Sequence, residues 1–263
     1  FDWYLQRHSD HLCLHAAAAT LGGRTICFPM VGKAGKSVLT AAIAAAGGEV
    51  FSDDVVALSA AGEAVAFGIS PRLRRPLPNI LGQGLRRFID RRAGPADRRW
   101  LYLNLAAGEI APYGTHRPID SFVLLQRSTN PTDAALTEIA AADVLAELIS
   151  QNFADAVPNV AMLDRLHRLV AGTSCYRLRY CRPEAAVRAL LARTPAASRN
   201  PAEATPARCQ DVEVAKPAQP PAEPVRVRRT KGVVTRATAD GSLFLTTADS
   251  IHVHRLDALG SAI

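Results

Sequence analysis

The stretch that decides the fold is residues 24–58, which read RTICFPMVGKAGKS (24–37), VLTAAIAAAGG (38–48) and EVFSDDVVAL (49–58). It begins with a β-prone run. The alanine-rich run after the loop favours a helix, and the glycine pair at its end is typical of a helix C-terminus. A second apolar run predicts another strand over residues 50–58, broken by Ser52-Asp53-Asp54. The stretch therefore predicts a strand, a tight loop, a helix and a strand.

The loop of this unit ends in Gly-Lys-Ser. A loop of this kind between a strand and a helix binds phosphate, because its backbone N–H groups and the helix N-terminus face the phosphate oxygens. In such loops the lysine reaches the terminal phosphates and the serine hydroxyl ligates Mg²⁺. The nucleotide-binding residues that we predict are Gly32, Lys33, Ala34, Gly35, Lys36 and Ser37. The alternative is an ordinary crossover with a glycine-rich turn.

Two adjacent aspartates, Asp53 and Asp54, interrupt the strand that follows the predicted helix. A carboxylate beside a phosphate loop can support Mg²⁺ in phosphoryl transfer, and a second one can accept a proton from an attacking hydroxyl. Because adjacent residues of a strand point to opposite faces, we expect the two aspartates to have different roles. The alternative for such a pair is the start of a turn.

His15, Lys36, Ser37, Asp53 and Asp54 resemble the HPr kinase/phosphorylase family and its diverged relatives. That family has a histidine on the strand before the loop and an Asp-Asp pair after it, and the spacing of both from the loop lysine is kept here without a gap. The resemblance implies that His15 and Asp54 handle the proton of a serine hydroxyl. It also implies that Asp53 and Ser37 support Mg²⁺ and that Lys36 binds phosphate. The candidate catalytic residues are therefore Asp54, His15 and Lys36, and the candidate metal ligands are Ser37 and Asp53.

The chain departs from the family pattern at three places. Met30 and Lys33 replace glycines of the family's loop, and Met30 lacks the access of glycine to positive φ. Residues 79–84 lie roughly where the family has a signature containing a metal-supporting glutamate, but they contain no glutamate. This absence argues against the reverse, dephosphorylating reaction.

Arginines are concentrated between Arg72 and Arg99, where nine of them are accompanied by only two aspartates. Arginine recognises phosphate and carboxylate groups through its planar guanidinium. One interpretation makes Arg74 or Arg75 a contact for the transferred phosphate or for an acidic peptide, and the alternative is a solvated face. We also hypothesise that residues 80–100 contain a loop that becomes ordered when ligand binds.

The composition bounds the remaining possibilities. The chain has 263 residues and is 48% hydrophobic, which is ample for a packed core. The net charge of +7 and the pI near 9.5 suit acidic partners, phosphates included. No basic motif interleaved with aromatic residues indicates nucleic acid. No apolar run approaches the roughly 20 residues of a membrane span, so we expect no membrane contact.

The five cysteines, which have no metal-ligand spacing, indicate the reduced thiols of a cytoplasmic protein. They are Cys13, Cys27, Cys175, Cys181 and Cys209. The chain opens on Phe1 without a signal peptide and stops abruptly at Ile263. We therefore expect a fragment of a longer protein.

Apolar periodicity predicts the other elements. We expect helices at residues 1–11, 143–153, 160–171 and 183–192. We expect strands at residues 12–20, 64–67, 100–105, 121–126 and 175–180, with a hairpin turn at residues 60–63. Together these predict an α/β fold with a mixed sheet flanked by helices, which the resemblance makes a P-loop kinase of HPr-kinase type over residues 1–193.

Residues 194–224 are rich in alanine, proline and charge and predict a mobile linker. The last part, residues 225–263, predicts three strands and the start of a helix, and resembles the opening of a PqqD-type peptide-recognition domain. This resemblance implies binding of a leader peptide as an added strand. Three short strands alone are marginally stable.

The leading hypothesis is an ATP- and Mg²⁺-dependent serine kinase acting on a protein or peptide with an acceptor serine, such as a ribosomally made peptide. A second hypothesis is a nucleotide-binding scaffold or chaperone of a peptide-modifying system with little or no activity, and a weaker third is a nucleoside-triphosphate hydrolase. The identity of the acceptor and the oligomeric state, homo-oligomers included, are left open.

Overall fold

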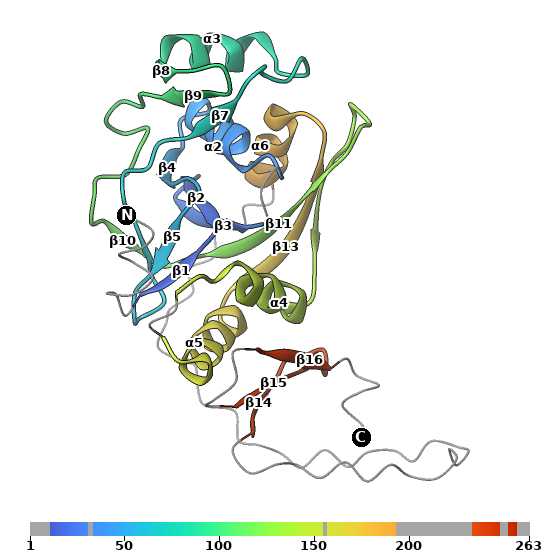
Figure 1. Cartoon of the computed structure of the whole chain (residues 1–263). Coiled ribbons are helices and arrows are strands. Elements are labelled where there is room, and N and C mark those ends of the chain that lie inside the picture. The colour runs from blue at the N-terminus through green and yellow to red at the C-terminus, as the bar shows by residue number, and fades with distance from the viewer. Residues whose placement is uncertain (1–10, 31–33, 155–156, 193–232, 248–251, 257–263) are drawn as a thin grey trace.

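The computed structural model describes residues 11–30, 34–154, 157–192, 233–247 and 252–256 (Figure 1). Several sequence predictions fall outside these residues. They are loop residues Gly32 and Lys33, the helix over residues 1–11 apart from its last residue, the linker over residues 194–224 and the helix start after residue 256.

A mixed six-stranded sheet lies at the centre of the fold. In order across the sheet its strands are β12 (Ala134–Glu138), β13 (Ser174–Tyr180), β11 (Ser121–Arg127), β3 (Arg24–Pro29), β2 (Ala16–Leu21) and β4 (Glu49–Ser52). Strand β11 is parallel to β3 and β13, and the other neighbouring pairs are antiparallel. The carboxyl ends of β3, β11 and β13 therefore lie at one edge of the sheet, where the predicted phosphate loop follows β3.

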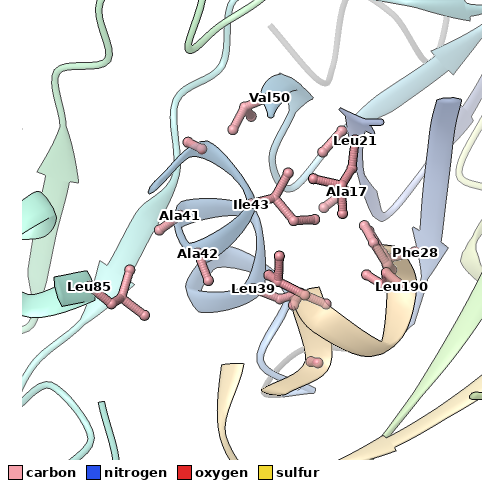
Figure 2. Packing of buried hydrophobic residues seen from close by; sticks show 14 of the residues in the cluster. Ala17, Leu21, Phe28, Leu39, Ala41, Ala42, Ile43, Val50, Leu85 and Leu190 are labelled. Carbon is pink, nitrogen blue, oxygen red and sulfur yellow. The ribbon is translucent and has the colours of Figure 1, made fainter. Parts of the chain in front are cut away.

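Helices contribute to two apolar cores. One core contains residues of α2 (Lys36–Ala45), α3 (Gln83–Arg91) and α6 (Pro183–Ala192), and the other contains residues of α4 (Ala141–Gln151) and α5 (Asn159–Ala171). Figure 2 shows part of the first core, where Leu39 and Ile43 of α2 face Ala17 of β2, Phe28 of β3 and Leu190 of α6. The predicted α/β fold with a mixed sheet and flanking helices is confirmed. No helix in the described part of the chain is both long and apolar enough to cross a bilayer.

The alanine run of residues 16–19 forms strand, although alanine favours helix. Ala17 and Ala19 belong to the first core, Ala16 and Ala18 belong to the second, and all four are fully buried. This alternation is the two-residue period of a strand between two helical layers. The single element predicted over residues 12–20 is instead two strands, β1 (Leu12–Leu14) and β2, which are separated at His15.

The single broken strand predicted over residues 50–58 is also two strands. Strand β4 ends at Ser52, and β5 (Val56–Leu58) belongs to a second sheet with the order β1, β5, β6 (Ala64–Val65) and β10 (His116–Arg117). Asp53 and Asp54 lie in the bend between the two sheets. The expectation that they alternate along a strand is therefore wrong, because the chain changes sheets where they stand. The predicted hairpin of β5 and β6 is confirmed.

Residues 80–100 are not the loop that the sequence suggested. They contain α3 and strand β8 (Ala93–Ala96), which pairs with β9 (Trp100–Leu103) beside β7 (Arg72–Arg74). Leu85, Phe88 and Ile89 are buried at helical spacing on α3. These three residues attach the arginine-rich helix to the first core.

The C-terminal part forms a small antiparallel sheet of β14 (Val233–Ala237), β15 (Leu243–Thr247) and β16 (His254–Leu256). It does not stand alone. Phe244 is fully buried in the second core with residues of α4 and α5. Arg236 pairs with Asp164 of α5 at 2.5 Å, and Arg255 pairs with Asp143 of α4 at 3.1 Å. Packing against these helices supplies the stability that three short strands lack alone.

Candidate functional site

Two segments of the chain cross between the same two sheets side by side. His15 separates β1 from β2, and Asp53 and Asp54 lie between β4 and β5. Because β1 pairs with β5 and β2 pairs with β4, the two crossings are neighbours. The pairing of strands therefore brings the histidine to the aspartates, although the predicted phosphate loop and the whole of α2 separate them along the chain.

The carboxylate of Asp54 lies between two basic side chains. Its Oδ1 is 3.4 Å from Nδ1 of His15, and its Oδ2 accepts a hydrogen bond of 3.2 Å from the guanidinium of Arg72. The backbone of Asp54 has a φ of 77°, and no other described residue except glycine has a positive φ. Such a conformation costs about 1–3 kcal/mol, and residues held in it cluster at active sites, ligand clamps and switch regions. The fold thus holds this carboxylate in a fixed orientation.

Asp53 differs sharply from its neighbour because it is buried. Its Oδ2 accepts a hydrogen bond of 3.2 Å from the backbone N–H of Arg72, and the Ser37 side chain also bonds to the carboxyl group. Burial raises the pKa of Asp53 to about 6, against the smaller opposite effect of those bonds. Its Oδ1 has no hydrogen-bond partner in the described structure. The two aspartates therefore differ in burial, and not by facing opposite sides of a strand.

Lys36 begins α2 and lies at the centre of the site. Its ammonium donates a hydrogen bond of 2.5 Å to the carbonyl of Met30. Burial lowers its pKa, and the nearby carboxylates of Asp53, Asp54 and Glu147 oppose that shift. The lysine and the aspartate pair are thus close enough to interact, as a phosphate site between them requires.

These side chains line one cavity of about 570 Å³. Residues 34–38 of the loop and first helical turn form one wall, and Arg72, Arg74 and Trp100 form another; His15, Asp53 and Asp54 complete the lining. Met30 packs against both apolar cores and is not part of the lining, so it does not block the cavity. Every sequence-predicted site residue that the structure describes lines this cavity, whereas Gly32 and Lys33 lie outside the described residues.

The loop is packed against the carboxyl end of β13. Gly35 has a φ of 93°, and a Cβ there would lie 2.8 Å from the hydroxyl of Tyr180, so only glycine fits. The Tyr180 hydroxyl donates to the carbonyl of Ala34 at 3.5 Å, and the guanidinium of Arg127 lies over its ring at 5.0 Å. Through these contacts, the neighbouring strands β11 and β13 set the shape of the loop.

Sequence reasoning missed several residues of the site. Arg72 was one arginine among nine, and Trp100 was assigned only to a strand. Glu147 and Tyr180 come from α4 and β13, far along the chain, and no local pattern marks them.

Residues 79–84, where the sequence resemblance led us to look for a metal-supporting glutamate, are not part of the cavity lining. The backbone N–H of Gly82 donates instead to the carboxylate of Glu184, on α6, at 2.6 Å. This segment therefore contacts α6 and lies outside the described lining of the cavity.

The oxygen atoms of Asp53 and Ser37 suit a hard divalent cation that takes most of its ligands from water and from substrate phosphates. Mg²⁺ prefers oxygen ligands and keeps waters and substrate phosphates around one or two carboxylates. The buried Asp53 carboxylate with its unpartnered Oδ1, next to the Ser37 hydroxyl, fits this requirement. The described residues include no cluster of three or more histidine, cysteine or acidic side chains, so an all-protein metal cage is absent from that part of the chain.

No family model and no curated protein matches the chain. Among solved structures, the HPr(Ser) kinase/phosphatase from Coxiella burnetii is similar to it at 10% sequence identity and a TM-score of 0.33. The match covers 68% of this chain and 88% of that chain. Because a TM-score of this size is too low to carry an argument, the function has to be argued from the site itself.

Proposed function

We propose that the chain is an ATP-dependent kinase that transfers a phosphoryl group to a serine hydroxyl of a protein or peptide. The observation that supports this most is the convergence of three chain segments on one cavity: His15, the Lys36-Ser37 turn and the Asp53-Asp54 bend. A lysine and helix N-terminus for phosphates, a buried carboxylate for a cation and a second carboxylate for a proton are the parts that phosphoryl transfer needs.

The nucleotide end of the cavity is the wall formed by residues 34–38. The N-terminus of α2 and the Lys36 ammonium bind the phosphates, while the Ser37 hydroxyl and the Asp53 carboxylate hold Mg²⁺. When bound, Mg²⁺ neutralises the charge that develops on the transferred phosphoryl group. Lys36 exchanges its bond to the Met30 carbonyl for a phosphate oxygen.

Asp54 is the base that accepts the proton of the acceptor hydroxyl. His15 and Arg72 hold its two oxygens from either side, which orients the carboxylate toward a hydroxyl in the cavity. A base must lie within hydrogen-bonding distance of the proton that it takes, so the acceptor serine binds beside Asp54. His15 is placed to share the proton once Asp54 has received it.

A second candidate is a nucleotide-binding scaffold that transfers no phosphate. Two observations favour it: the Lys36 ammonium is bonded to the Met30 carbonyl, and the described lining of the cavity contains no glutamate. This candidate predicts ATP binding that depends on Lys36 without incorporation of phosphate into any serine peptide. A leader peptide bound at the C-terminal strands would be compatible with either candidate.

The test is incubation with labelled ATP and Mg²⁺ and with the small peptides encoded beside the gene, followed by mass spectrometry of each peptide. Lys36→Met keeps the side-chain volume and removes the charge, and we expect it to lower phosphate incorporation about 100- to 1,000-fold. Arg87→Ala is the matched control, since this residue of α3 is exposed and bonds to Gln83 of the same helix. Full turnover by Lys36→Met would refute the assignment, and ATP binding without transfer by the wild type would favour the scaffold.

A further inference from the structure

The nine arginines between Arg72 and Arg99 have different roles in the fold. Five of them use their guanidinium groups in hydrogen bonds to other residues: Arg72, Arg75, Arg86, Arg87 and Arg92. The other four, Arg74, Arg91, Arg98 and Arg99, have neither a side-chain hydrogen bond nor an ion pair to any described residue. Of these four, Arg74 alone lines the cavity that holds Lys36 and Asp54.

Strand β7 explains why Arg74 reaches the cavity. Leu73 is fully buried in the first core, so Arg72 and Arg74 lie on the opposite face of the strand. Both line the cavity, whereas the next residue, Arg75, donates to the carbonyl of Asp97 at 3.2 Å and is not part of the lining. Two residues along a strand span roughly 6.6 Å. Arg74 therefore lies about that far along the strand from Arg72, the partner of Asp54.

The other charged groups of the cavity already have partners. Asp53 bonds to the backbone of Arg72, Asp54 contacts His15 and Arg72, and Lys36 bonds to the carbonyl of Met30. Arg72 also lies over the ring of Trp100, with its guanidinium 4.5 Å from the ring centre. Arg74 is exposed and has no such partner in the described structure. Its charge is thus available to an anionic group that enters the cavity.

We propose that Arg74 selects an acidic acceptor peptide, in which a carboxylate stands two residues from the accepting serine. In an extended peptide, side chains two residues apart point to the same face and are separated by roughly 6.6 Å. This spacing matches that of Arg72 and Arg74 along β7. A serine beside Asp54 thus brings an aspartate or glutamate at the second position to Arg74, where the guanidinium binds it bidentately. This inference rests on the proposed kinase function.

Arg74 belongs to the acceptor side of the cavity and not to its triphosphate side. The phosphates are assigned to the loop wall, which offers the α2 N-terminus and Lys36. Arg74 instead belongs to the strand that carries Arg72, the side chain that orients the base Asp54. An arginine on this wall contacts the acceptor, and its removal should leave ATP affinity unchanged.

In the experiment, the full chain is incubated with ATP, Mg²⁺ and a positional library of serine-containing octapeptides. Mass spectrometry then identifies the phosphorylated peptides. We expect enrichment of aspartate and glutamate two residues from the serine, and roughly tenfold loss of kcat/KM when that residue is changed to glutamine. Arg74→Ala should abolish the enrichment, and Arg74→Glu should shift it to lysine. Arg75→Ala is the matched control and should behave as the wild type.

The outcomes separate this inference from the kinase function. Incorporation without acidic enrichment, or enrichment that persists in Arg74→Ala, overturns the inference alone. An Arg74→Ala variant that binds ATP as weakly as Lys36→Met also overturns it, because Arg74 would then be a phosphate contact. No incorporation into any library member, by a wild-type protein that binds ATP, overturns both the inference and the kinase function.

Discussion

The two walls of the cavity are built in different ways. The loop wall, residues 34–38, is continuous in the chain and is recognisable from its residue order. The opposite wall is formed by Arg72, Arg74 and Trp100, which come together only because β7 pairs with β9. A phosphate needs a backbone cradle of fixed shape, which a short motif can supply, whereas an acceptor is recognised by side chains that differ between proteins. Under the proposed function, the loop wall is therefore the general part of the site and the opposite wall is its specific part.

The sharpest way to break this comparison is to change Asp54, the proposed base, which lies between the walls. Asp54→Asn should lower phosphate transfer by about 100- to 10,000-fold, as removal of a general base does. Asparagine tolerates a positive φ, so the bend should keep its shape. Transfer kinetics and ATP affinity are measured together, with Asp90→Asn on α3 as control. Loss of ATP affinity equal to that of Lys36→Met would contradict a role on the acceptor side.

A second prediction concerns Asp53, whose carboxyl group has its pKa raised from 3.8 to about 6. The folded protein then holds this proton more tightly than the unfolded chain. Stability should therefore fall as pH rises from about 4 to about 6, and the loss from this group should be complete above that range. The full shift corresponds to about 3 kcal/mol.

Denaturant unfolding of the ligand-free protein across this pH range measures the effect. The difference between the wild type and Asp53→Asn isolates the contribution of the one carboxyl group, since other acids titrate in both proteins. Identical pH slopes in the two proteins would show that burial does not hold the proton on Asp53.

The smallest expected effect sharpens the description of the loop wall. Gly35→Ala places a Cβ against the Tyr180 hydroxyl, whereas Gly47→Ala, at a φ of 85°, has no atom within 4 Å. Both variants strain a positive φ, so their difference measures the contact with Tyr180. We expect Gly35→Ala to be about 1–2 kcal/mol less stable than Gly47→Ala and to bind ATP more weakly. Thermal unfolding and ATP titration measure the two differences. Equal stability and equal ATP affinity of the two variants would contradict the prediction.

Local sequence was enough for the loop and its helix, because a strand, a glycine turn and an alanine-rich run are all contiguous signals. It was not enough for Asp53 and Asp54, since their bend depends on which sheet each flanking strand joins. The spacing of Leu85, Phe88 and Ile89 is that of a helix, but the prediction from sequence placed a loop in this arginine-rich segment. The contact of Arg72 with Asp54 required the tertiary structure, because nothing local distinguishes that arginine from its neighbours.

The burial of Phe244 has a consequence for the order in which the molecule is made. Residues of α4 and α5 share an apolar core with this side chain, which is synthesised only after β13, α6 and β14 have followed α5. Domains generally fold as units while the chain emerges from the ribosome, with the N-terminal part first. The segments that carry the loop, the aspartates and Arg74 are synthesised before α4. We therefore expect the layer of α4 and α5 to keep part of its apolar surface uncovered until β15 has been synthesised.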